Sequence, residues 1–300
     1  MTHRLPFLVA SLAVLSACTP ATAQRAAADD IPCASCAEWN APQQPFRIFG
    51  NSYWVGTHGL GSILVTSPQG HVLIDGALPE SAPAILASIR ALGFRPEDVK
   101  LILNSHAHFD HAGGIAELQR ATGAEVAASP WSARVMERGA SDASDPQYGV
   151  LRHYPAVAKV RPFADGDTLR VGPLALVAHF TGGHTPGGTT WSWRSCDGAR
   201  CLDLVYADSQ TPVSADGFLF TRNTTYPSAI ADFERGFAAL DALRCDVLLT
   251  PHPDASQLWQ RIAARDAGQQ DALVNADACR AYAAAARERL QQRMAKEQAR

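Results

Sequence analysis

The chain contains the stretch Asn104-Ser105-His106-Ala107-His108-Phe109-Asp110-His111-Ala112-Gly113-Gly114, in which three histidines and one aspartate fall within six positions. The apolar run 99–103 before it has the length of a buried strand, so the motif follows a strand end. Side chains two apart in extended backbone point the same way, and we expect His106 and His108 to face one metal ion. Asp110 and His111, past the bend, face a second. These ligands suit zinc better than iron or manganese; the alternative is a polar loop with solvated histidines.

Composition sets the class of protein. The 300 residues are 47% hydrophobic and 18% charged, with a net charge of −3. Such a chain is soluble and globular, and its length suits one large domain of two sheets. It has no basic cluster that could neutralise a phosphate backbone, so nucleic acid is not an expected partner. We expect a monomer that acts on a small molecule.

The N-terminus predicts export. A basic start, Met1–Arg4, precedes the apolar run 5–17, which is too short to span a bilayer, and residues 1–17 therefore predict a signal peptide. Leu15-Ser16-Ala17-Cys18 resembles a bacterial lipobox, in which Cys18 becomes a lipid anchor; cleavage after Ala21-Thr22-Ala23 is the alternative. We expect a periplasmic protein with a spacer at 18–38 and a single domain at 39–300.

Hydrophobic periodicity predicts alternating strands and helices. Strands are expected at 46–55, 62–66, 71–75, 99–103, 125–128, 169–171, 174–180, 189–193, 202–207 and 246–250. Helices are expected at 80–93, 115–122, 130–138, 228–243, 255–264 and 278–297. The long irregular segment 139–155 predicts a flap beside the site, because such segments are more often functional than incidental. The charged end 287–300 predicts a solvated surface.

Three motifs carry a family resemblance. His106-Ala-His108-Phe-Asp110-His111 resembles the HxHxDH signature of the metallo-β-lactamase superfamily. The second and third ligand motifs of that family are similar to Gly182-Gly183-His184-Thr185-Pro186-Gly187-Gly188 and Leu248-Leu249-Thr250-Pro251-His252-Pro253. With the stretches 191–196 and 205–209, the pattern resembles the third subclass of metallo-β-lactamases from about Trp39 to Tyr282. The resemblance implies an α+β fold, a four-layer αβ/βα sandwich of two mixed sheets with the active site where the sheets meet.

The same resemblance implies a two-zinc hydrolase. His106, His108 and His184 would hold the first Zn²⁺, and Asp110, His111 and His252 the second. A hydroxide generated from water between two such cations would open the β-lactam ring of an antibiotic and so confer resistance. Asp110 is the implied catalytic residue, because its free oxygen would orient this hydroxide.

Substrate contacts are implied at Ser209, Thr211 and Gln147. The two hydroxyls would face the substrate carboxylate, and Gln147 lies in the flap near the substrate carbonyl. Glyoxalase-like members instead place a metal-bridging carboxylate at the position of Asp208, so a thioesterase or lactonase is the alternative; we expect Asp208 to point away into a structural network. An exported zinc-binding lipoprotein without enzymatic activity is the third hypothesis.

Seven cysteines predict three disulfides with Cys18 left over, because pairing is the default in an oxidising compartment. Cys196 and Cys201 flank a polar turn between two strands, and a bridge there closes a hairpin. The resemblance implies this pair and Cys245–Cys279. The family's N-terminal cysteine partner is absent, since His58 occupies its position, and we expect a local Cys33–Cys36 bridge instead. We do not expect a zinc site at Cys33 and Cys36, because no second pair of free cysteines remains to complete its ligands.

The remaining histidines predict no further site. His71, His153 and His179 lie in strands or loops without a second ligand nearby in sequence, and His3 is in the signal. His58 lies in a glycine-flanked turn. We expect it to be structural, with a place at the mouth of the site as the alternative.

Overall fold

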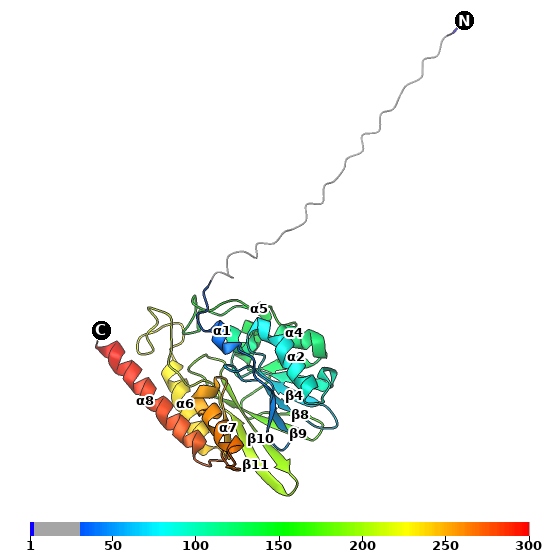
Figure 1. Ribbon diagram of the computed structural model, residues 1–300. Helices are drawn as coiled ribbons and strands as arrows, with labels where there is room; N and C mark the ends of the chain where they lie inside the picture. The colour runs from blue at the N-terminus through cyan, green and yellow to red at the C-terminus, as the bar shows by residue number, and fades with distance from the viewer. Residues whose placement is uncertain (3–30, 300) are drawn as a thin grey trace.

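The computed structural model describes residues 1–2 and 31–299. Most of the predicted signal, Cys18 and most of the spacer lie outside the described residues. Two sheets pack face to face, and helices cover the outer side of each (Figure 1). The predicted sandwich of two mixed sheets is therefore confirmed. Within the described residues, no helix is both long and apolar enough to cross a bilayer.

The first sheet has seven strands in sequence order. They are β1 (Phe46–Phe49), β2 (Ser52–Trp54), β3 (Ile63–Val65), β4 (His71–Ile74), β5 (Val99–Leu103), β6 (Glu125–Ala128) and β7 (Val160–Pro162). Pairing is antiparallel from β1 to β4 and parallel from β4 to β7. The prediction of one strand at 46–55 is wrong, because the chain reverses at Gly50, whose φ of +53° favours glycine. β7 was not predicted.

The second sheet has five strands in the order β12-β11-β10-β9-β8. Their bounds are β8 (Thr168–Val171), β9 (Leu174–Phe180), β10 (Thr189–Asp197), β11 (Arg200–Tyr206) and β12 (Val247–Leu249). Only β11 and β12 pair in parallel. β9 and β11 both run antiparallel to β10, so β9, β11 and β12 end at the same edge.

The helices pack on the outer faces. They are α1 (Cys36–Trp39), α2 (Ala82–Ala91), α3 (Phe109–Ala112), α4 (Ile115–Thr122), α5 (Pro130–Arg138), α6 (Ala229–Ala242), α7 (Leu258–Asp266) and α8 (Ala278–Gln298), with 3₁₀ turns at Pro79–Ser81, Pro96–Asp98 and Pro253–Ser256. Leu101 and Leu103 of β5 join the core between the sheets, whereas Ile102 joins the core under α2, α4 and α5. Both faces of this strand are buried, which explains its continuous apolar run.

The C-terminal helix differs from the prediction. α8 packs against α6, and Leu290 and Glu297 are buried. The expectation that 287–300 forms only a solvated surface is therefore wrong, because Glu297 accepts hydrogen bonds from the backbone N–H groups of Phe220 and Thr221.

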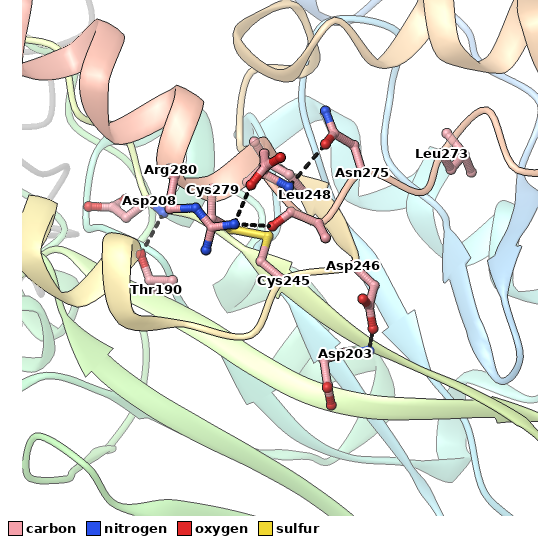
Figure 2. The surroundings of a disulfide bond; sticks show 12 residues. Thr190, Asp203, Asp208, Cys245, Asp246, Leu248, Leu273, Asn275, Cys279 and Arg280 are labelled. Carbon is pink, nitrogen blue, oxygen red and sulfur yellow. Dashed lines mark hydrogen bonds and ion pairs between the residues drawn. A yellow bond between two sulfur atoms is a disulfide. The ribbon is translucent and has the colours of Figure 1, made fainter.

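The structure contains the three predicted disulfides, Cys33–Cys36, Cys196–Cys201 and Cys245–Cys279. Figure 2 shows the last of these, which joins Cys245, two residues before β12, to the first turn of α8. Cys36 also begins the short helix α1, which the sequence did not predict.

Candidate metal centre

The histidines of all three motifs follow strand ends. His106 and His108 come after β5, His184 after β9 and His252 after β12. The backbone N–H of Thr189, at the start of β10, donates to the carbonyl of Ser105 at 2.8 Å and joins the two sheets at this edge. The sheets thus bring together residues that are 146 positions apart in the sequence, from His106 to His252.

Asp75, directly after β4, fixes the segment that leads into the first motif. Its buried carboxylate accepts from the N–H of Ser105 at 2.7 Å, the hydroxyl of Ser105 at 2.6 Å, the amide of Asn104 at 3.1 Å and the hydroxyl of Tyr206 at 3.0 Å. Asp75 adopts a φ of +62°, an uncommon conformation for a residue other than glycine. This carboxylate therefore links the segment after β5 in the first sheet to Tyr206 at the end of β11 in the second.

One cluster consists of His106, His108 and His184, all buried. One potential ligand atom of each lies within 4.8 Å of the others. The ring centroid of His106 lies 4.7 Å from that of His108 and 4.8 Å from that of His184. We call these three residues the first group.

Each imidazole of the first group has one nitrogen engaged with the protein. His106 Nδ1 lies 2.7 Å from Asp208 Oδ1, His108 Nε2 lies 3.0 Å from Asp145 Oδ2, and His184 Nδ1 lies 2.9 Å from the carbonyl of Thr211. These three acceptors share one role. They fix the orientation of each ring and leave His106 Nε2, His108 Nδ1 and His184 Nε2 for a metal ion.

A second cluster adjoins the first. Asp110 and His111, on α3, form with His106 another set of ligand atoms within 4.8 Å of one another. His252 Nε2 lies 3.3 Å from Asp110 Oδ2, and its ring centroid is 4.8 Å from that of His111. Asp110, His111 and His252 are called the second group. Trp39 of α1 packs against His252 with ring centroids 5.1 Å apart.

Unpartnered buried nitrogens indicate that these groups fit metal ions. His106 Nε2 and His111 Nδ1 are buried and have no hydrogen-bond partner among the residues that the structure describes. A buried polar atom without a partner costs about 1–3 kcal/mol. Coordination removes this cost, and an imidazole-rich set with one carboxylate suits a divalent transition metal.

The protonation states of His106, His184 and Asp110 also suit ligation. Burial, followed by the neighbouring His111 and His108, lowers the pKa of His106 well below its usual range. Burial is also the main cause that lowers the pKa of His184 to about 3. Burial alone would raise the pKa of Asp110, but His111 and His252 outweigh it and hold that pKa well below its usual range. His106 and His184 are thus neutral and Asp110 is ionised at neutral pH, as metal ligands must be.

Asp208 lies behind His106. Neither cluster of potential ligands found among the described residues includes it. Its backbone N–H donates to Thr190 Oγ1, and its carbonyl accepts from the hydroxyl of Tyr282. This placement agrees with the expectation of a structural network, although the sequence did not predict His106 as the partner.

The three expected substrate residues lie around the first group. Ser209 follows Asp208 and is 7% exposed, and Thr211 is exposed with its carbonyl on His184. The N–H of Gln147 donates to Asp145 Oδ1 at 2.9 Å, so Gln147 lies in the flap two residues from the carboxylate on His108. The directions of the Ser209, Thr211 and Gln147 side chains toward a substrate stay predictions.

Sequence reasoning missed two carboxylates. Asp145 lies in the segment 139–155, which has turns but neither helix nor strand, although all of it is described. Nothing in the sequence near Asp145 marks it as a partner of His108. Asp75 carried a weak signal, because an aspartate directly after an apolar strand must find donors at the sheet edge. The exposed ring of His58 stacks on Trp259 with centroids 4.6 Å apart, which fits the expected structural role, and the alternative place at the mouth of the site stays a prediction.

Solved structures similar to this chain share its fold over nearly their whole length. Rm3 metallo-beta-lactamase is 58% identical, with a TM-score of 0.87, and the match covers 89% of this chain and 99% of that one. MEM-A1, a subclass B3 metallo-beta-lactamase from a soil metagenome library, is 49% identical, with a TM-score of 0.85 and coverage of 87% and 99%. MIM-1 from Novosphingobium pentaromativorans is 46% identical, with a TM-score of 0.82 and coverage of 87% and 93%.

Curated relatives match over shorter regions. Hydroxyacylglutathione hydrolase of Anaeromyxobacter dehalogenans is 33% identical over 124 residues, which are 40% of this chain and 37% of that protein. N-acyl homoserine lactonase AttM of Azorhizobium caulinodans is 31% identical over 81 residues, 20% of this chain and 31% of that protein. The chain thus spans about a third of the length of these relatives.

Residues 61–269 match the profile of the metallo-beta-lactamase superfamily. With the two sheets, the His-His-His and Asp-His-His groups and these structural neighbours, the chain belongs to that superfamily and, within it, to the subclass B3 metallo-beta-lactamases.

Proposed function

We propose that the protein is an exported, zinc-dependent hydrolase that opens the β-lactam ring of antibiotics. The observation that carries this proposal is the pair of adjoining groups, three histidines beside Asp110, His111 and His252, at an edge where both sheets end. Structural neighbours at 44–58% identity that are named as metallo-beta-lactamases support it.

The first group would hold one Zn²⁺ and the second group another, and the ions would lower the pKa of a water molecule and polarise the substrate carbonyl. Asp110 is buried and ionised, so its carboxylate would accept a hydrogen bond from the attacking water and orient the oxygen of that water toward the carbonyl carbon. The hydroxyls of Ser209 and Thr211 would donate to the substrate carboxylate, and the Gln147 amide to the substrate carbonyl. No side chain forms a covalent bond with the substrate.

Hydrolysis assays with a penicillin, a cephalosporin and a carbapenem test the proposal. The loss of absorbance of the β-lactam ring monitors the reaction. We expect activity to disappear after EDTA treatment and desalting, to return with zinc, and to resist inhibitors that acylate serine. His184→Ala should reduce the rate by several orders of magnitude, because a ligand of the first group is lost. The matched control is His58→Ala, which removes an exposed histidine stacked on Trp259. Full hydrolysis after EDTA and desalting would contradict the mechanism.

The glyoxalase-like alternative rests on the local similarity to a hydroxyacylglutathione hydrolase and a homoserine lactonase. A carboxylate that bridges both metal positions would support it, and Asp208 is the residue in question. Its Oδ1 is instead engaged with His106 Nδ1, the nitrogen that faces away from the metal position. Turnover of thioesters or lactones faster than of every β-lactam would favour the alternative.

Export through residues 1–17, with Cys18 as a lipid anchor of an otherwise monomeric periplasmic domain at 39–300, is part of the proposal. The three disulfides support it, because such bonds persist in oxidising compartments. Growth with a radioactive fatty acid tests the anchor: the protein should carry label, and Cys18→Ala should not. Unlabelled wild-type protein in the soluble periplasmic fraction would instead support cleavage after Ala23.

A further inference from the structure

The flap, residues 139–155, places one buried carboxylate against the first group. Asp145 is 1% exposed, and its Oδ2 lies 3.0 Å from His108 Nε2. The same oxygen accepts from the hydroxyl of Ser141 at 2.8 Å, and Oδ1 accepts from the N–H of Gln147 at 2.9 Å. One side chain thus connects a predicted metal ligand with a hydroxyl before it and a backbone N–H after it in the flap.

The backbone around Asp145 extends this connection. Its N–H donates to the carbonyl of Asp142, and its carbonyl accepts from the N–H of Tyr148. The carbonyl of the next residue, Pro146, accepts from the N–H of Ala215 at 2.8 Å. Ala215 belongs to the loop that follows Thr211, whose own carbonyl is bonded to His184. The two segments expected to contact substrate are therefore joined to each other and to two histidines of the first group.

We infer that Asp145 is a positioning residue that couples the flap to occupancy of the first metal position. This inference rests on the proposed two-metal site. An imidazole that coordinates a cation through Nδ1 donates more strongly from Nε2, so the bond from His108 to Asp145 strengthens on metal binding. Such coupling is reciprocal. If metal binding stabilises the ordered flap by a given free energy, the ordered flap makes metal binding more favourable by the same free energy.

Zinc affinity tests the first half of the inference without an activity measurement. Competition with a chromogenic chelator is measured in a His252→Ala background, which removes a ligand of the second group and leaves the first group intact. Adding Asp145→Asn should weaken zinc binding by about 10- to 100-fold. The matched control is Asp142→Asn, in the same flap, because the Asp142 carboxylate contacts Ser144 and Arg138 and no histidine. Equal affinity of the Asp145→Asn protein and its parent would overturn the inference.

Hydrogen exchange of residues 139–155 with and without zinc tests the second half. We expect zinc to slow exchange in the wild-type flap and in Asp142→Asn, but not in Asp145→Asn. Ser141→Ala serves as a milder variant in case Asp145→Asn fails to fold, and it should reduce both zinc affinity and zinc-dependent protection by a smaller factor. Wild-type protein that binds no zinc would refute the proposed function. Zinc-bound wild-type protein whose flap exchanges as fast as the zinc-free flap would refute only the coupling.

Discussion

Residues 208–211 combine two tasks within four positions. Asp208 Oδ1 and the carbonyl of Thr211 orient His106 and His184, while the hydroxyls of Ser209 and Thr211 are the groups that we propose to bind the substrate. Gln210 stabilises the segment from inside, because its buried amide donates to the carbonyls of Thr181 and Ser209. Groups that orient the histidines and groups that would bind substrate therefore share one short stretch of backbone, which the hydrogen bonds of Gln210 anchor.

This arrangement allows a prediction that separates the two tasks. Ser209→Ala should raise KM by about tenfold to a hundredfold and leave zinc content unchanged, because a hydrogen bond to a charged group contributes about 1.5–3 kcal/mol. Steady-state kinetics and metal analysis of the same preparation measure both. Ser228→Ala, which removes an exposed hydroxyl before α6, is the control. An unchanged KM on every β-lactam tried would remove Ser209 from the substrate site.

Site residues were predictable where the sequence concentrates them. Three histidines and an aspartate within six positions indicate a metal site without any structure. His184 and His252 stand alone in their motifs and were predicted through the family resemblance. Asp145 could not be predicted, because a carboxylate in a segment without periodicity has no expected neighbour. Its partner, His108, is 37 residues away and meets it only after the flap has folded.

At the scale of elements, strands and helices with a strong hydrophobic pattern lie where the sequence predicts them. β5, β6, β9, α4 and α5 have the predicted bounds. The errors occur where a contact from a distant segment overrides local pattern. The hairpin at Gly50 depends on Ser195, whose Oγ accepts from the N–H of Asn51, and α8 is buried because the loop before α6 folds onto it. Neither contact can be read from residues 46–55 or 287–300 alone.

Glu297 gives the C-terminal helix a pH-dependent contribution. Its carboxylate accepts from two backbone N–H groups and from Arg293. Burial acts to raise its pKa, but these donors outweigh burial and the pKa of Glu297 is lowered. A carboxyl group with a lowered pKa in the folded state stabilises the protein above the pKa of the unfolded chain, about 4.3, and loses this effect as pH falls further.

Glu297→Gln should therefore lower the free energy of unfolding at pH 7 by about 1.5–3 kcal/mol, the range for hydrogen bonds to a charged group. The difference from wild type should stay constant down to about pH 5 and shrink below about pH 4.3, where the wild-type carboxylate takes up a proton. Urea unfolding over this pH range measures it. The control is Glu288→Gln, on the exposed face of α8. A difference that persists unchanged at pH 3 would show that the charge of Glu297 is not the cause.

Over the whole molecule, the three disulfides constrain very different lengths of chain. Cys33–Cys36 and Cys196–Cys201 close separations of 3 and 5 residues, whereas Cys245–Cys279 closes 34. The last joins the segment just before β12, the strand that leads to His252, to α8 on the outer layer (Figures 1 and 2). In the chain-entropy account, a crosslink stabilises by restricting the unfolded state, and the effect grows with the length that it closes.

Replacing Cys245 and Cys279 together with alanine should lower the free energy of unfolding by about 3–4 kcal/mol, against about 2 kcal/mol for the hairpin pair Cys196 and Cys201. Cys245 and Cys279 are buried, and the small cavity left by their sulfurs adds to the loss. Urea unfolding of both double variants in the zinc-bound form measures the difference. Zinc content should remain at the wild-type value in each, since neither pair contacts the metal groups. A larger loss for the hairpin pair would mean that native-state contacts at Cys196 and Cys201, and not loop length, set the order.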